Sequence, residues 1–146
     1  MQSLQAIMQF LALLSCGLFA GAAVYINLVE HPARMECGAA IAVKEFAPSY
    51  RRAAIMQASL ALLGLICAVV AWLAGANLYW LIGGILLGLV IPFTLVIIFP
   101  TNKQLLDPAL DTNSDQARQL LLQWGRLHAV RSGLSVTALV LFLLNV

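Results

Sequence analysis

Four long apolar stretches divide the chain, and polar segments separate them. The apolar stretches cover residues 4–28, 53–75, 78–99 and 127–146. Each holds roughly 20–25 residues, which at 1.5 Å rise per residue is enough to cross a hydrocarbon core of about 30 Å. A chain in lipid must satisfy its own backbone hydrogen bonds, so the spans are predicted to be helices. The pattern therefore predicts an all-α membrane protein whose single domain, residues 1–146, is a four-transmembrane-helix bundle.

The second and third spans are joined by a very short link at residues 76–77, which predicts a tight antiparallel hairpin. Trp72, Tyr79 and Trp80 surround this link. Tryptophan and tyrosine are enriched where a helix passes through the headgroup layer. These three side chains are therefore expected to form an aromatic belt at that membrane surface.

Glycine pairs and prolines mark the first and third spans. Gly-x-x-x-Gly occurs at residues 17–21 and 84–88, a spacing that lets helix backbones approach closely. We expect it to serve packing within one bundle, with a homo-oligomer as the alternative. Pro92 lies inside the third span and is predicted to kink it, and Pro100 is predicted to end it.

The fourth helix is predicted to begin well before its apolar part. Asn113 or Ser114 can cap it, and Asp115 suits the positive dipole end of its first turn. No proline interrupts the chain from there to Arg131. The helix is therefore expected to emerge from the membrane by several turns.

Charge is confined to two segments of the chain. All eight basic and six acidic side chains lie within residues 30–52 and 103–131, and each segment holds four Lys or Arg. Positively charged loops stay in the cytoplasm, so residues 30–52 and 103–126 are predicted to be cytoplasmic loops. Both termini are then outside, in what we expect to be the inner membrane of a bacterium.

The composition supports the lipid bilayer as the surroundings of this chain. Hydrophobic residues make up 62% and charged residues 10%, against about 25% charged in soluble domains. The net charge of +2 is small and says little about partners, and no basic stripe with interleaved aromatics suggests nucleic acid, so we expect no nucleic-acid partner. Cys16, Cys37 and Cys67 form no C-x-x-C pair, which argues against a redox dithiol or a zinc site.

A polar cluster stands where the fourth span begins. Trp124, His128 and Arg131 are spaced i, i+4 and i+7, so they share one helix face, while Arg126 points elsewhere and can reach the headgroups. The first span ends in Asn27, followed by Glu30 and His31. The third ends near Asn102, and Tyr50 precedes the second. All are expected at the cytoplasmic side.

We predict that these polar helix ends surround one pocket. The alternative is that each is an ordinary interfacial residue, since such residue types are common at headgroups. Glu30 and Arg34, for instance, can form an exposed i, i+4 ion pair that contributes little. Against this, the opposite membrane side has no comparable set of Asn and His. That asymmetry favours a site.

Four pieces of the sequence, taken together, resemble the anthrone oxygenase-like family of small helical membrane proteins. They are GLFAGAAVYINLVEHPAR (17–34), PSYRRAAIMQA (48–58), PTNKQLL (100–106) and WGRLHAVRS (124–132). They stand in the family's order along four spans, so the likeness covers nearly the whole chain. It implies a cofactor-independent oxygenase or oxidoreductase that uses O₂ on a small aromatic, anthrone-like molecule.

The resemblance implies roles for the polar cluster. A histidine, which titrates near neutral pH, suits the base that removes a carbon-bound proton, and an arginine suits the stabilisation of the resulting anion. His128 and Arg131 are the implied catalytic residues, and Trp124 offers an aromatic platform. The other implied substrate-binding residues are Asn27, His31, Asn102, Glu30 and Tyr50.

Two other functions are compatible with the same residues. His31, His128 and Glu30 could form a two-histidine, one-carboxylate metal site, or the two histidines could bind haem. A non-catalytic membrane protein that binds a small molecule is the second alternative. Transport is less favoured, because transporters place polar residues near mid-membrane and these spans are apolar there except around residues 92–94.

Overall fold

The computed structural model describes residues 2–146, and within them the chain is helical apart from short turns. It forms four helical rods that are each long and apolar enough to cross a membrane. The first rod comprises α1 (Gln2–Tyr25), the π-helix η1 (Ile26–Glu30) and α2 (His31–Glu36), and the second is α3 (Ala39–Leu73). The third comprises α4 (Leu78–Gly88), α5 (Val90–Phe93), the π-helix η2 (Thr94–Ile98) and α6 (Phe99–Leu105), and the fourth is α7 (Asp115–Leu143).

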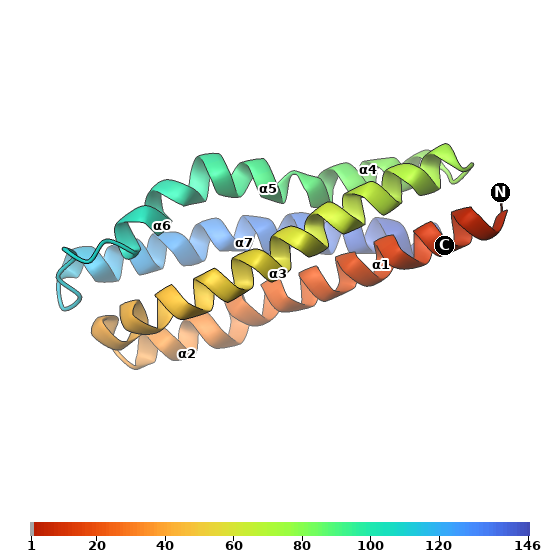
Figure 1. The fold of residues 1–146 in the computed structure, drawn as a ribbon. Helices are drawn as coiled ribbons and strands as arrows, with labels where there is room; N and C mark the ends of the chain where they lie inside the picture. The colour runs from red at the N-terminus through yellow and green to blue at the C-terminus, as the bar shows by residue number, and fades with distance from the viewer. Residues whose placement is uncertain (1) are drawn as a thin grey trace.

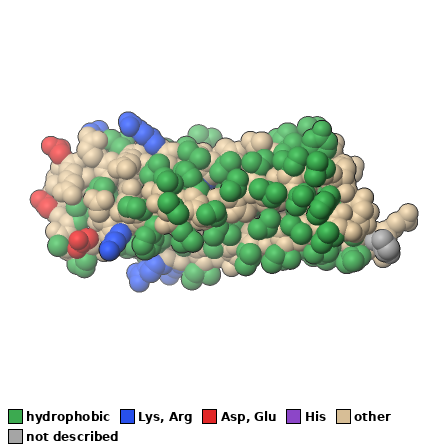
Figure 2. Space-filling view, turned by 90° about the horizontal axis from the view of Figure 1, so that it is seen from above, with side chains coloured by type: hydrophobic (Ala, Val, Ile, Leu, Met, Phe, Trp, Pro, Cys, Tyr) green, Lys and Arg blue, Asp and Glu red, His purple; other side chains and the backbone are tan. Residues whose placement is uncertain are grey.

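The four rods form one antiparallel bundle. α1 packs on α3 and α7, and α4 packs on the same two helices. Both termini lie at one end, while α2 and α6 lie at the other (Figure 1). Acidic and basic side chains gather at the end that holds α2 and α6, whereas hydrophobic side chains cover the rest of the visible surface (Figure 2). We call these the charged end and the turn end. The chain is therefore an integral, all-α membrane protein.

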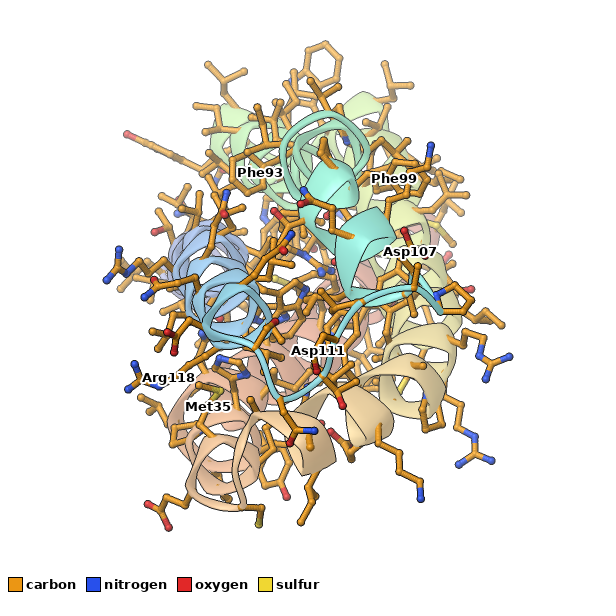
Figure 3. All side chains as sticks on the ribbon, turned by 90° about the vertical axis from the view of Figure 1, so that its left-hand side faces the viewer. Met35, Phe93, Phe99, Asp107, Asp111 and Arg118 are labelled. Carbon is orange, nitrogen blue, oxygen red and sulfur yellow. The ribbon has the colours of Figure 1, made fainter. Side chains whose placement is uncertain are left out.

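The helices extend further than the predicted spans. Residues 30–52, expected as a connecting loop, are helical except at Cys37 and Gly38, where Gly38 turns the chain with a φ of 89°. In the second charged segment the irregular chain is limited to residues 106–114. That stretch carries Asp107 and Asp111 across the charged end (Figure 3). The apolar run shows how much of a helix can lie in lipid, but not where the helix stops.

α7 begins where the capping residues predicted. The Ser114 side chain accepts a hydrogen bond from the backbone N–H of Ala117 at 3.1 Å, and Asp115 occupies the first turn. The early part of α7 packs against α6 at the charged end. The predicted extension of this helix beyond its apolar part is confirmed.

Two prolines, one in the first rod and one in the third, follow widened helical turns. Pro32 and Pro100 each come two residues after the end of a π-helical segment. At the first segment, the backbone N–H of His31 donates to the carbonyl of Ile26. At the second, the backbone N–H of Phe99 donates to the carbonyl of Thr94. Proline lacks a donor and crowds the carbonyl four residues before it. The wider turn relieves that crowding, so the helix continues. The prediction that Pro100 ends the third helix is therefore wrong.

Pro92 has the predicted effect on the third rod. It cannot donate to the carbonyl of Gly88, and the regular α-helix is interrupted at Leu89. α4 therefore ends one turn before the proline, and α5 begins a new segment. This interruption matters for the cavity described below.

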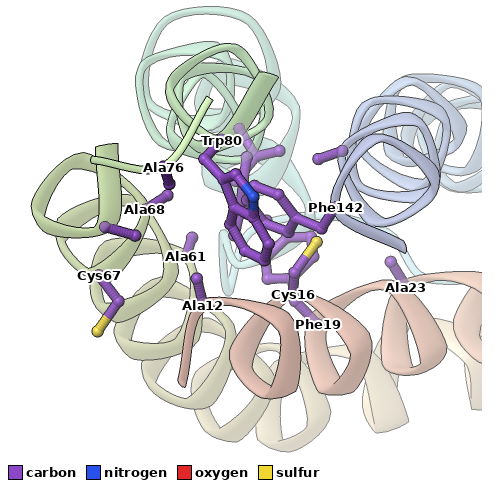
Figure 4. Packing of buried hydrophobic residues seen from close by; sticks show 14 residues of the cluster. Ala12, Cys16, Phe19, Ala23, Ala61, Cys67, Ala68, Ala76, Trp80 and Phe142 are labelled. Carbon is purple, nitrogen blue, oxygen red and sulfur yellow. The ribbon is translucent and has the colours of Figure 1, made fainter. Parts of the chain in front are cut away.

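The turn between α3 and α4 confirms the predicted hairpin, while the three aromatic residues around it differ: Trp72 and Tyr79 are exposed, and Trp80 is not. Gly75 adopts a φ of 109°, and the Asn77 side chain caps α4 by accepting from the N–H of Tyr79 at 3.1 Å. Trp80 is fully buried: its ring stacks on Phe142 with centroids 4.7 Å apart, and its indole N–H donates to the carbonyl of Asn145 at 3.0 Å. Figure 4 shows the two rings together between the helices. Trp80 thus ties the C-terminus to the bundle.

The two Gly-x-x-x-Gly motifs differ in what they contact. A Cβ atom on Gly84 would lie 2.7 Å from the Cβ of Ala68, and one on Gly88 would lie 2.8 Å from a methyl of Leu65. These glycines therefore let α4 approach α3 closely within the bundle. A Cβ on Gly21 would meet nothing within 4 Å. The expectation of packing within one bundle holds for the second motif.

We expect Gly84→Leu to destabilise the protein, because the side chain would force α4 away from α3. Overpacking of this kind costs about 1–3 kcal/mol. Thermal unfolding in detergent, followed by circular dichroism, measures the effect. Gly21→Leu is the matched control and should change the midpoint little. Equal shifts in the two variants would contradict the close α3–α4 contact.

Candidate active site

A cavity of about 150 Å³ lies inside the bundle toward the charged end. Residues of η1 and α2, of α3, of α5 and η2, and of α7 enclose it. Its polar and aromatic lining comprises Glu30, Arg34, Phe46, Ser49, Tyr50, Gln57, Thr94, Trp124, His128 and Arg131. All four rods thus contribute to one enclosed environment.

Hydrogen bonds across two helices hold the ring of His128. Its Nδ1 lies 2.8 Å from the Oδ1 of Asn27 on η1, and the Ser132 hydroxyl donates to the same oxygen at 2.5 Å. The Nδ2 of Asn27 donates to the carbonyl of Gly125 at 3.1 Å. Asn27 therefore joins the first rod to three residues of α7.

The orientation of the Asn27 amide determines the tautomer of His128. The amide nitrogen of Asn27 donates to the carbonyl of Gly125, so its amide oxygen faces the His128 ring. An amide oxygen can only accept a hydrogen bond, so Nδ1 of His128 must be the donor. In the neutral imidazole Nε2 then carries the lone pair. No group among residues 2–146 hydrogen-bonds to Nε2, and His128 lines the cavity while being only 1% exposed. The ring therefore offers the cavity an acceptor nitrogen.

Aromatic rings form one wall of the cavity. The ring of Trp124 lies against that of His128, with centroids 4.8 Å apart and planes at 29°. Phe46 meets Trp124 edge-on at 5.3 Å and stacks on Tyr50 at 5.6 Å. Phe46, Tyr50 and Trp124 thus present aromatic rings to the cavity.

Arg131 places a guanidinium in the cavity without a carboxylate partner among residues 2–146. Its terminal nitrogen donates to the Oε1 of Gln57 at 2.7 Å, and its Cζ lies 5.4 Å from the centre of the Phe19 ring. Its Nε and the Nε2 of Gln57 are buried with no partner in the described chain. An unpaired cation in a poorly hydrated site favours an anion beside it.

Arg34, in contrast, is neutralised by two carboxylates. It pairs with Glu30 on the first rod and with Glu45 on α3, where Nε and Oε2 are 2.8 Å apart without hydrogen-bond geometry. Ser49 donates to Glu30 at 2.9 Å. Arg34 is only 6% exposed and lies over the Trp124 ring at 5.8 Å. The Glu30–Arg34 pair of the interfacial alternative does form, but Arg34 is buried, because Glu45 of α3 also contacts it.

The structure brings most of the predicted site residues together. Glu30, Tyr50, Trp124, His128 and Arg131 line the cavity. The predicted helix face is thus confirmed. Arg126, two residues from His128, is exposed on another face as expected.

The three other predicted residues lie behind the lining or away from it. Asn27 contacts the His128 ring from outside the cavity. His31 packs against Trp124 at 5.2 Å between ring centroids, and a Cβ on Gly125 would lie 2.7 Å from its ring, so a glycine is needed there. Asn102 is buried in α6, and neither of its side-chain polar atoms has a hydrogen-bond partner within the described residues. Their predicted contact with substrate has no support in this geometry.

Several residues of the site were not predicted from the sequence, among them Gln57, Ser132 and Arg34. Gln57 is a polar residue in an otherwise apolar span, which is itself a signal of function or packing. Ser132 follows His128 by four residues and so lies on the same face. The role of Arg34 depends on contacts with α3 that no local pattern reveals.

The structure gives the metal alternative no ligand cluster. Among residues 2–146, no three His, Cys, Asp or Glu side chains are grouped so that they could hold a metal ion. His31 and His128 both pack against the Trp124 ring. Cys16 and Cys67 are buried free thiols, whereas Cys37 is exposed.

The fold and the cavity define a class: an integral four-helix membrane protein with an enclosed, partly aromatic polar site. The chain belongs to the anthrone oxygenase family, whose sequence model matches residues 46–141, about two thirds of its length. The matched range includes Trp124, His128 and Arg131, while the first rod with Asn27 lies outside it. Searches of curated proteins and of solved structures give no significant match.

We expect Asn27→Leu to release the His128 ring. Without the amide oxygen, nothing fixes the proton on Nδ1, so the single tautomer should become a mixture. Nitrogen NMR of protein labelled at its two histidines measures the tautomer directly. Asn102→Leu removes another buried asparagine away from the cavity and should leave His128 unchanged. A single Nδ1-protonated form in Asn27→Leu would contradict the assignment.

Proposed function

We propose that this protein oxidises a small, enolisable aromatic molecule of the anthrone type with O₂ and without a cofactor. The observation that carries the proposal is that one cavity is lined by a histidine whose Nε2 has no hydrogen-bond partner among residues 2–146 and by an arginine without a carboxylate partner there. Membership of the anthrone oxygenase family supports it. Glu30 and Tyr50, which also line the cavity, are proposed as substrate contacts.

His128 is the proposed base. Its Nε2 removes a proton from the methylene carbon that lies across the central ring from the ketone, and the C–H electron pair is delocalised through the aromatic system onto the ketone oxygen, which gives the enolate. A base held by an orienting hydrogen bond on its other nitrogen is a recurrent catalytic arrangement. Asn27 and Ser132 are positioning residues in this scheme, because they act through the ring.

Arg131 is the proposed stabiliser of the negative charge. The enolate carries charge on the former carbonyl oxygen, and a preorganised guanidinium in a poorly hydrated site stabilises that charge as it develops. Gln57 and Phe19 hold the guanidinium in place without neutralising it. Arg34 is unsuited to this task, since Glu30 and Glu45 already balance its charge.

The oxidation itself then balances without a further reactant. The enolate gives one electron to O₂, and the resulting carbon radical and superoxide combine to a peroxide that takes a proton from His128. Removal of the second methylene proton breaks the O–O bond and releases water, which leaves a carbonyl. One oxygen atom of O₂ enters the product, and the other leaves with the two methylene hydrogens.

The cavity volume limits how the ligand sits. An engineered cavity of similar volume binds one benzene ring, so a cavity of about 150 Å³ encloses one ring of an aromatic ligand. The other rings of an anthrone-like molecule must lie toward an opening.

The charged end is proposed to face the cytoplasm of a bacterium, across its inner membrane. It carries all eight Lys and Arg side chains, and both termini lie at the opposite end. Positively charged segments are retained on the cytoplasmic side. The cavity then opens nearer to the cytoplasmic leaflet.

We expect His128→Ala to abolish protein-dependent oxidation. Loss of a general base lowers the rate by about 10²–10⁴-fold. Oxygen uptake with anthrone as the probe, corrected for its spontaneous oxidation, measures the rate in reconstituted membranes. Arg126→Ala, an exposed change two residues away, should retain the activity.

Two outcomes of that experiment would contradict the proposal. Unchanged uptake in folded His128→Ala would remove the role of the histidine. A wild-type protein that binds anthrone without stimulating uptake would be a small-molecule binder, which is the non-catalytic alternative.

We expect the single exposed cysteine to report the orientation. Cys37 lies at the charged end, whereas Cys16 and Cys67 are buried. A membrane-impermeant maleimide should therefore label the protein in inverted vesicles and not in intact cells. Cys37→Ser should abolish the labelling. Labelling of intact cells would reverse the proposed orientation.

A further inference from the structure

One wall of the cavity is built from residues that also reach the outer surface. Ala54 and Ala58 on α3 face Ile91 on α5 and Leu95 on η2 across the cavity. Ala58 is exposed, and Leu95 is 64% exposed. Both belong to rods that are apolar enough to cross a membrane. The cavity therefore reaches the side of the bundle within its apolar zone.

This wall is thin because the third rod changes its contact with α3 along its length. α4 lies close to α3 through Gly84 and Gly88. After the interruption at Leu89 the rod continues as α5 and η2, which make far less contact with α3 (Figure 1). The facing α3 residues are alanines, which leave the space between the rods unfilled.

The wall offers no polar group to a ligand that passes through it. Thr94 also lines the cavity, but its hydroxyl donates to the carbonyl of Val90 at 2.6 Å. Ala54, Ala58, Ile91 and Leu95 present only hydrocarbon. The other polar side chains of the cavity belong to α7, to the first rod and to further positions of α3. A ligand crossing here would have to be apolar except at its leading edge.

The direction toward the charged end is closed by large side chains. Phe46 and Trp124 are buried and in edge-on contact. Arg34 lies over the same tryptophan and is held by Glu30 and Glu45. An aromatic molecule that entered from the charged end would have to displace this buried ion pair.

We propose that the ligand enters sideways from the lipid, between α3 and the α5–η2 segment. The ligand class is a bilayer-dissolved aromatic with a phenol or enolisable ketone at one edge. That edge leads and reaches His128 and Arg131, while the apolar rings trail toward the opening. The ligand class rests on the proposed function, whereas the route is tested by binding alone.

A wider hollow on the other side of α3 is the rival route. It has a volume of about 480 Å³, and Tyr25, Arg52 and Met56 line it. Ile26, Glu30, Ser49 and Ala53 border both spaces, so they form the partition between them. The Ser49–Glu30 hydrogen bond and the Glu30–Arg34 ion pair hold this partition closed.

Binding kinetics in lipid nanodiscs test the route. The probe is 1-naphthol, a bicyclic phenol, followed under nitrogen by its own emission. Leu95→Trp should obstruct the opening, so the association and dissociation rate constants should each fall by at least about tenfold while Kd stays within about twofold. Doubling the lipid at constant probe should also slow association, because the concentration within the membrane falls.

Two matched variants accompany the test. Val96→Trp changes the neighbouring residue, which is 68% exposed and does not line the cavity. Met56→Trp obstructs the rival hollow. Both should bind 1-naphthol at the wild-type rates, and thermal unfolding should confirm that all three variants are folded.

Several results would overturn the proposed route. The first is that folded Leu95→Trp binds 1-naphthol at the wild-type rates, and the second is that it binds more weakly but associates no more slowly. The third is that binding is slower in Met56→Trp alone, and the fourth is that the wild type shows no saturable binding. Binding without oxygen uptake would overturn the oxidation and leave the route standing.

Discussion

The polar half of this bundle depends on the hydrogen bonds of one amide. Inside a membrane, a polar group without a partner is costly, so polar side chains there must satisfy one another. Asn27 uses both ends of its amide: it donates to Gly125 and accepts from His128 and Ser132. The same contacts fix the distance between the first rod and α7, the tautomer of the histidine and the direction of its free nitrogen. Asn27 therefore contributes both to the packing of the first rod on α7 and to the tautomer of His128.

The turn end and the charged end of the bundle are built on different principles. At the turn end, small residues and the Trp80–Phe142 stack bring the helices together without space between them. Toward the charged end, Pro32 and Pro100 follow widened turns, the third rod is interrupted before Pro92, and that rod no longer follows α3 closely. The space that opens there is bordered by alanines on one side and by the ring of Trp124 on the other. The cavity thus lies where the third rod departs from α3.

The sequence predicted the features that depend on local periodicity. Four spans, the cap at Ser114, the interruption near Pro92 and the common face of Trp124, His128 and Arg131 all follow from spacing along one helix. The features it did not predict depend on neighbouring helices. Trp80 is buried because Phe142 lies opposite, and Arg34 is neutralised because α3 returns beside it with Glu45. Pro100 lies within a helix because a π-turn precedes it. Only a structure places Gln57 opposite Arg131.

The contrast between the two arginines of the cavity bears most directly on its chemistry. Both guanidiniums are largely removed from water, where a charge without a partner is costly. At Arg34 two carboxylates compensate that cost, and the result is a structural tie between the first rod and α3. At Arg131 the side-chain amide of Gln57 and the ring of Phe19 contact the guanidinium instead of a carboxylate. They offset only part of the cost of burying its charge. A site in this condition stabilises an anion more than it stabilises a neutral molecule. The proposed substrate enters as a neutral molecule and becomes an enolate only when it loses a proton to His128. Arg131 therefore stabilises the transition state of proton removal more than it stabilises the bound substrate, and such a difference accelerates a reaction.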